Sequence, residues 1–306
     1  MTIPTTAETW LSGYIPDLPT PFDERGAVDL AAFRRLCERQ IAAGVSAILV
    51  CETAGEASTL SPAEHEAIVH AAVEVAGGRT RVIAGAGSNS THHAIDLTRR
   101  AEDVGADAVM SVVPYYNKPM QEGLYEHFRA IADSTALPVI LHDIPSRTMR
   151  ELANSTLARL ADSRQFVGLR DGSGDVARPL RLSGLLPSRF QYLTGDDAIA
   201  PAYLANGGDG CISTISNVAP HLCRKIFSGV RHGRLQAACD LQRRLMPLQT
   251  CLSRDNPAAL KYALSLLGLM HPTTRLPIVE LDATAKAAVA IALTAIDEDQ
   301  RATVRA

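Results

Sequence analysis

Several apolar runs in this chain end abruptly in residues that can do chemistry. Arg170 and Asp171 close the run 166–169 and are followed by the turn Gly172-Ser173-Gly174. An apolar run that ends in charged residues is typical of a buried parallel strand whose carboxyl end opens into a site. A guanidinium at such an end can hold a carboxylate. His142 ends another run, and the ordinary pKa of an imidazole suits proton transfer.

Reading the ends of all the apolar runs gives the candidate site residues. Polar residues are expected there in any soluble barrel, so the kind of side chain matters more than its polarity. The set is Thr20, Glu52, Thr53, Ser88, Asn89, Tyr115, Tyr116, His142, Asp143, Arg170, Asp171, Asp196, Asp197 and Ser213.

Eight strand-like runs that alternate with helical patterns must position these residues. The expected strands are 14–18, 47–50, 81–84, 108–113, 138–141, the run that begins at Phe166, 191–194 and 210–213. Ser61-Pro62-Ala63-Glu64 predicts a capped helix start. Repeated strand-helix units predict an α/β fold, a (β/α)8 TIM barrel, over residues 1–219. Only helical patterns follow, so residues 220–306 are expected to form a C-terminal helical extension.

Composition excludes several classes of function. The chain has 306 residues and a net charge of -3, which gives no reason to expect nucleic acid or an anionic membrane as a partner. The sequence has no signal-like N-terminal segment and no apolar run long enough to span a bilayer, so a cytoplasmic protein is expected. The six cysteines lack paired CxxC spacing. No metal and no cofactor is expected.

Short motifs along the chain together resemble those of the dihydrodipicolinate synthase and N-acetylneuraminate lyase family. Residues 51–56 (CETAGE) are similar to the family's GTTGE loop, and residues 114–119 (PYYNKP) are similar to its tyrosine-pair loop. Residues 142–147 (HDIPSR) resemble its YNxPSR motif. Further matches are 194–197 (TGDD), 207–213 (GGDGCIS), 256–261 (NPAALK) and 275–277 (RLP).

The resemblance implies roles for individual residues. Thr53 falls on the hydroxyl that relays protons, and Tyr116 on the tyrosine that is lent to a neighbouring subunit's site. Arg147 matches the arginine that holds a carboxylate. The substrate-binding residues implied in this way are Arg147, Thr53, Ala54, Gly195, Asp196 and Ile212. A homodimer or homotetramer is implied as well.

Two positions depart from the family in the catalytic apparatus. Arg170 stands where the family carries the lysine that forms a Schiff base with pyruvate, and His142 stands where it carries the catalytic tyrosine. A Schiff base needs an amine that can lose its proton, and a guanidinium stays protonated. We therefore expect a protein that binds a small 2-keto acid such as pyruvate, with the usual Schiff-base aldol chemistry lost or strongly impaired.

Alternatives remain open at this point. The chain could be a non-catalytic ligand-binding or regulatory paralogue, or an active synthase of this family with an engineered lysine-to-arginine change at Arg170. Arg170 could be a structural cation paired with Glu52, Asp171 or Asp143, or it could grip a keto or dicarboxylic acid together with Arg147. His142 could be a packed histidine or a base.

Overall fold

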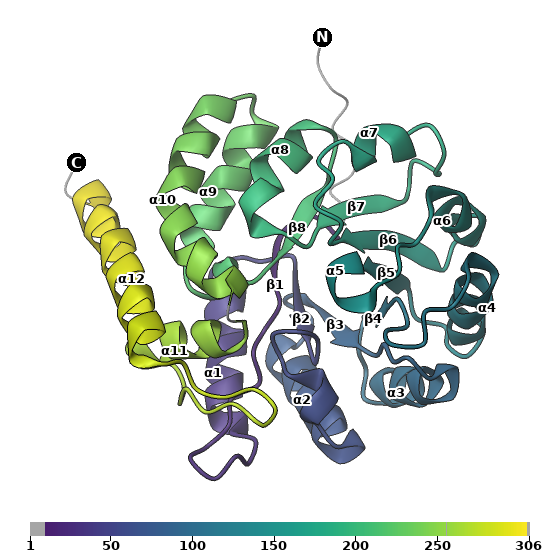
Figure 1. Cartoon of the computed structure of the whole chain (residues 1–306), viewed down its shortest axis with the longest axis horizontal. Helices are drawn as coiled ribbons and strands as arrows, with labels where there is room; N and C mark the ends of the chain where they lie inside the picture. The colour runs from purple at the N-terminus through teal and green to yellow at the C-terminus, as the bar shows by residue number, and fades with distance from the viewer. Residues whose placement is uncertain (1–9, 255, 305–306) are drawn as a thin grey trace.

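Eight parallel strands form one sheet that curls into a nearly closed barrel (Figure 1) in the computed structural model, which describes residues 10–254 and 256–304. The sheet order is β1-β8-β7-β6-β5-β4-β3-β2, and β1 meets β2 through a bridge between Asp17 and Leu49. The strands are β1 (Gly13–Pro16), β2 (Ala47–Val50), β3 (Arg81–Gly85), β4 (Ala108–Val112), β5 (Val139–Asp143), β6 (Phe166–Asp171), β7 (Gln191–Thr194) and β8 (Gly210–Ser213).

Helices connect the strands and cover the outside of the barrel. They are α1 (Leu30–Ala42), α2 (Pro62–Ala76), α3 (Thr91–Asp103), α4 (Gln121–Ala132), α5 (Pro145–Thr148), α6 (Asn154–Ala161), α7 (Arg178–Leu182) and α8 (Ala200–Ala205). The C-terminal region adds α9 (Pro220–Arg231), α10 (Leu235–Arg254), α11 (Ala258–Leu266) and α12 (Ala283–Val304). The predicted barrel with a helical C-terminal region is confirmed, and the domain boundary after residue 219 stays a prediction.

The start of α2 is the one that the sequence predicted. The Ser61 hydroxyl accepts from the Glu64 backbone N–H at 3.3 Å, and the Glu64 carboxylate accepts from the Ser61 N–H at 2.9 Å. Pro62 occupies the first helical position, where the backbone N–H has no partner within the helix. This reciprocal cap fixes where the chain turns after the loop that follows β2.

Alternation along the strands separates two apolar layers. Ala47 and Leu49 of β2 point into the barrel interior, while Ile48 and Val50 pack against the outer helices. Both faces are buried, which is why these strands read as continuous apolar runs. Ile212 of β8 belongs to the interior layer and is fully buried.

The same alternation fixes the uppermost layer of the interior. Ile15, Ile140 and Leu193 point inward, and the residues two positions after them are Asp17, His142 and Gly195. Arg170 follows Gly168 in the same way, and a Cβ at Gly168 would lie 2.7 Å from the interior side chain of Leu11. Charged and polar groups therefore lie directly above an apolar plug at the carboxyl ends of the strands.

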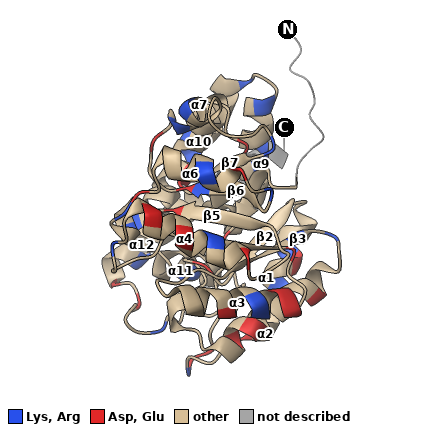
Figure 2. Cartoon of the chain, turned by 90° about the vertical axis from the view of Figure 1, so that its right-hand side faces the viewer, with Lys and Arg blue, Asp and Glu red and all other residues tan. Residues whose placement is uncertain are grey.

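The outer surface mixes charges of both signs. Figure 2 shows acidic and basic residues interspersed along α3 and α4. In the part of the chain that the structure describes, no helix is both long and apolar enough to cross a membrane.

Candidate functional site

Arg170 lies in the uppermost interior layer and is only 4% exposed. Its Nη1 donates to Asp17 Oδ2 at 3.0 Å and to Glu52 Oε2 at 3.1 Å. Gly195 makes room for the side chain, because a Cβ there would lie 3.2 Å from Arg170 Nε. Arg170 is therefore a buried cation held between two carboxylates, and it reaches across the barrel interior from β6 to the ends of β1 and β2.

Glu52 is the centre of this cluster. The chain leaves β2 through Cys51, whose φ of 56° is left-handed, and this turn directs Glu52 inward. The Glu52 carboxylate accepts from Arg170, from His142 Nδ1 at 2.9 Å, and from both the backbone N–H and the hydroxyl of Thr53. Three of the four residues predicted to be catalytic thus surround one carboxylate.

Burial controls the ionisation of the cluster. It raises the pKa of Asp17 to about 7; Arg170 opposes that shift and the Glu52 carboxylate adds to it. Burial also lowers the pKa of His142 against the opposing pull of Glu52, so the imidazole is neutral at pH 7 and donates its Nδ1–H. For Glu52 burial acts upward, but the electrostatic attraction and hydrogen bond of His142, the Arg170 charge and the Thr53 hydrogen bond together outweigh it and lower the pKa of Glu52. Glu52 is the anion, and Asp17 titrates near neutral pH.

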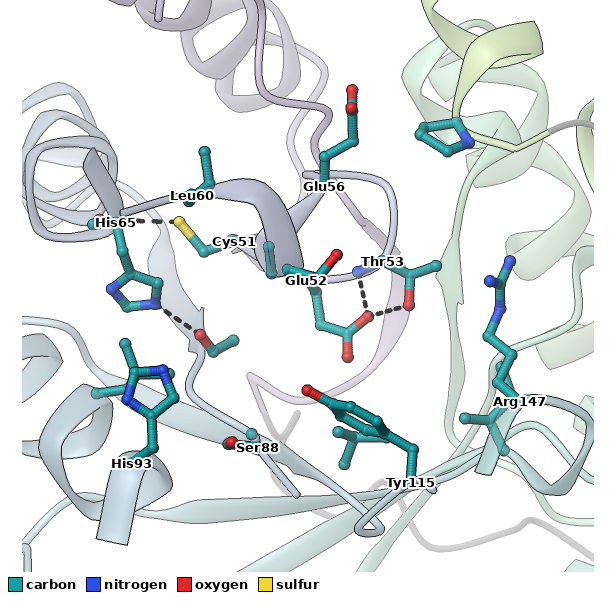
Figure 3. Close-up of a pocket in the computed structure, with 18 of the residues that line it drawn as sticks. Cys51, Glu52, Thr53, Glu56, Leu60, His65, Ser88, His93, Tyr115 and Arg147 are labelled. Carbon is teal, nitrogen blue, oxygen red and sulfur yellow. Dashed lines mark hydrogen bonds between the residues drawn. The ribbon is translucent and has the colours of Figure 1, made fainter. Parts of the chain in front are cut away.

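A cavity of about 540 Å³ opens in front of Glu52. Figure 3 shows Glu52 and Thr53 between Arg147 on one side and His65 and His93 on the other. Tyr115 also lines this cavity. Arg170 and His142 are not among the lining residues, because they lie behind Glu52. The cavity wall therefore presents the carboxylates of Glu52 and Glu56, several hydroxyls that include that of Thr53, two imidazoles and one guanidinium.

Arg147 differs from Arg170 in its surroundings. It is exposed on α5, and its guanidinium makes no ion pair with another residue that the structure describes. Because Arg170 is enclosed and already paired, the arrangement does not favour a joint grip of one ligand by Arg147 and Arg170. Arg147 is left as the cation that can meet an incoming carboxylate.

The remaining predicted site residues are spread over several environments. Tyr116 is 92% exposed on the loop after β4, outside the cavity, with a left-handed φ of 73°. Ala54 is fully buried, and Ile212 belongs to the apolar interior. Asp196 caps the short helix after β7 by accepting from the Ala198 N–H at 2.9 Å.

A second buried cation accounts for Asp143 and Asp171. Nη1 of Arg178, on α7, donates to Asp143 Oδ2 at 2.7 Å and to Asp171 Oδ1 at 3.0 Å. Tyr203 donates to the other Asp171 oxygen at 3.1 Å. Of the three partners considered for Arg170 from the sequence, only Glu52 pairs with it; the other two carboxylates bind Arg178 instead.

Two charged residues of these clusters were not identified from the sequence. Asp17 was missed although it is a charged residue inside an otherwise apolar strand-like run, which is a signal that it must have a buried partner. Arg178 was missed because an arginine early in a short helix looks like an ordinary surface residue. In the described part of the chain, no group of three or more His, Cys, Asp and Glu residues is arranged to hold a metal ion.

The chain is similar to the proteins of one family over most of its length. The model of the Dihydrodipicolinate synthetase family matches residues 10–296. The 4-hydroxy-tetrahydrodipicolinate synthase of Hyphomonas neptunium is 50% identical over 284 residues, which cover 92% of this chain and 97% of that protein.

Solved structures give the same result. Dihydrodipicolinate synthase from Aquifex aeolicus superimposes with a TM-score of 0.91 at 37% identity, covering 94% of this chain and 98% of that one. The Acinetobacter baumannii dihydrodipicolinate synthase, solved in complex with pyruvate, has a TM-score of 0.90 at 38% identity, with coverage of 93% and 98%.

Removing the buried cation should strongly destabilise the fold. Arg170→Met leaves Asp17 and Glu52 without a counter-charge, so we expect the free energy of unfolding to fall by about 3–5 kcal/mol. Urea denaturation at pH 8 measures this loss. Arg100→Met is the matched control, because Arg100 pairs with Glu66 at 2.9 Å on the surface, and its loss should cost about 1 kcal/mol or less. Equal effects of the two substitutions would contradict the structural role of Arg170.

Asp17 should make stability depend on pH. Its pKa is raised in the folded protein to about 7, whereas an unfolded aspartate titrates near about 3.9. The folded state therefore binds more protons between these values, and this contribution to stability is lost as the pH rises from about 4 through 7. Compared with Asp17→Asn, the wild type should become progressively less stable over this range. Urea denaturation of both proteins at several pH values tests the prediction, which a pH-independent difference would contradict.

Proposed function

The chain belongs to the dihydrodipicolinate synthetase family, and we propose that it binds a small 2-keto acid such as pyruvate without forming a Schiff base. The observation that carries this proposal is the enclosure of Arg170 between Asp17 and Glu52. The resemblance of the motifs implies that Arg170 stands at the position of the family's Schiff-base lysine. A buried, doubly paired guanidinium can be neither a nucleophile nor a proton donor to substrate.

No lysine replaces it at the cavity. The described residues that line the cavity include none. The chain has four lysines, Lys118, Lys225, Lys261 and Lys286. Lys261 is buried against Glu56, and Lys118 lies on the exposed loop after β4. Without an amine in the cavity, a keto acid can be held only non-covalently.

The groups that would move protons are also engaged. Thr53 donates its hydroxyl to Glu52, and neutral His142 donates its Nδ1–H to the same carboxylate. Neither hydrogen is free for a reacting oxygen or carbon in the cavity. This supports loss of the aldol reaction, and it also favours the second candidate function, a non-catalytic ligand-binding paralogue.

The keto acid is proposed to bind through Arg147. Its guanidinium is the cation of the cavity wall, and a carboxylate can accept two parallel hydrogen bonds from it. Tyr115 provides a further polar group on the same wall. The pyruvate complex of the Acinetobacter baumannii protein supports the ligand class.

An engineered single change at position 170 is not favoured. Asp17 and Glu52 both accept from the guanidinium, and His142 orients Glu52. Asp17, Glu52 and His142, which come from three different strands or loops, are thus arranged around the arginine. A single substitution of lysine by arginine would not explain this arrangement.

A second copy of the chain is proposed to cover the loop after β4. Tyr116, Met120 and Met149 are all strongly exposed, and the left-handed Tyr116 costs backbone strain of about 1–3 kcal/mol that a contact could offset. Together with the resemblance of this loop, these exposed apolar side chains support a homodimer or homotetramer.

Borohydride reduction in the presence of pyruvate should leave no covalent adduct on this chain, because Arg170 cannot form an imine. Intact-mass spectrometry measures the result. A family member with lysine at the matching position serves as the positive control. A mass increase of one reduced pyruvate, mapped to Lys118 or Lys261, would sink the proposal.

Light scattering on the purified protein should give an oligomer at low concentration. Tyr116→Asp places a charge in the proposed contact and should shift the mass towards the monomer. Leu235→Asp is the control, since it puts the same charge on an exposed apolar residue at the start of α10. A strictly monomeric wild type, or equal effects of both variants, would reject the interface.

A further inference from the structure

Four hydrogen-bond donors converge on the Glu52 side chain. His142 Nδ1 lies 2.9 Å from Oε1, and Arg170 Nη1 lies 3.1 Å from Oε2. The backbone N–H and the hydroxyl of Thr53 both donate to Oε2. All four donors belong to residues that the sequence predicted for catalysis or substrate binding, and all four bind a carboxylate of the chain itself.

This donor set is one that would bind a free carboxylate. A guanidinium, an imidazole N–H, a hydroxyl and a backbone N–H each donate to carboxylate oxygens, and those from charged groups are the strongest. With Glu52 in place, however, Arg170 already serves two carboxylates, so no positive charge remains for another anion.

The backbone is shaped to deliver Glu52 to these donors. Cys51, just before it, adopts the left-handed conformation. The turn is packed so closely on Gly85 that a Cβ at Gly85 would lie 2.1 Å from the Cys51 carbonyl oxygen. Glu52 is only 8% exposed. The close packing of the turn holds the carboxylate inward.

We propose that Thr53, His142 and Arg170 form a binding site for a small monocarboxylate and that Glu52 is its built-in occupant. The site accepts a free carboxylate only when the Glu52 side chain is absent. This proposal deepens the proposed function, and one of its consequences rests on that function. In the wild type the keto acid binds at Arg147, because Glu52 already occupies the donors of Thr53, His142 and Arg170. Glu52 then determines which position in the cavity a carboxylate can use.

Chemical rescue tests the proposal. Glu52→Ala removes a fragment of the size of acetate, so sodium acetate is the probe, with sodium chloride at equal ionic strength as the reference. We expect acetate to raise the melting temperature of this variant saturably, by about 2 °C or more above any rise in the wild type, in which only Arg147 can meet a carboxylate. Equal responses of the two proteins, or no response of a folded Glu52→Ala variant, would overturn the proposal.

Two further variants identify the site. Glu52→Gln keeps the position filled by a side chain of the same size, so acetate should not stabilise it. Thr53→Val in the Glu52→Ala background removes one donor and should weaken acetate binding about tenfold or more. An undiminished acetate response in the Thr53→Val double variant would count against the proposed donor set.

Two further measurements keep the test decisive if Glu52→Ala does not fold or if the wild type does not bind pyruvate. If Glu52→Ala is unfolded in chloride, acetate but not chloride should restore its circular dichroism spectrum; no restoration contradicts the proposal. Pyruvate binding by the wild type should be lost in Arg147→Ala, whereas Glu52→Ala/Arg147→Ala should keep its response to acetate. If the wild type binds no pyruvate while acetate still rescues Glu52→Ala, the proposed function is rejected. The same pair of results supports Glu52 as the built-in occupant.

Discussion

A guanidinium deprived of water is the constraint around which the carboxyl end of this barrel is arranged. Arg170 is enclosed above the apolar interior, and a buried charge is tolerated only when opposite charges and hydrogen bonds replace the lost hydration. Asp17 and Glu52 provide the charges, Gly195 leaves space for the side chain, and His142 holds Glu52 in place. Removing Arg170 would leave two carboxylates without a counter-charge in a medium of low dielectric constant.

Other buried cations at this end of the barrel have their own carboxylates. Arg178 binds Asp143 and Asp171. Lys261 of α11 lies 2.5 Å from Glu56 and 3.9 Å from the centre of the Phe22 ring, which joins the C-terminal region to the loop after β2. Each of these cations thus pairs with carboxylates close to it. Satisfaction of the buried charges leaves Arg147 as the cation available on the described cavity wall.

The pairing of charges at the strand ends limits the chemistry that the neighbouring cavity can support. The resemblance implies an amine and a proton relay at the strand ends, and the residues that it matches to them are here a paired guanidinium and groups bound to Glu52. The cavity in front of them is still present, with about 540 Å³ of space. This cavity and its polar groups support the proposed non-covalent binding of a small carboxylate.

The sequence by itself determined the strands, the capped start of α2, the barrel and the absence of an amine at position 170, because these depend on residue type and on periods of two and 3.6 residues. It could place Arg170, His142 and Thr53 at strand ends, but it could not choose the partners of Arg170 among several nearby acids. Asp17 is 153 positions away from Arg170, and Asp143 and Asp171, which are close in the sequence pattern, bind Arg178. Only closure of the barrel decides this, since a buried charge pairs with whichever carboxylate the folded interior brings within hydrogen-bond distance.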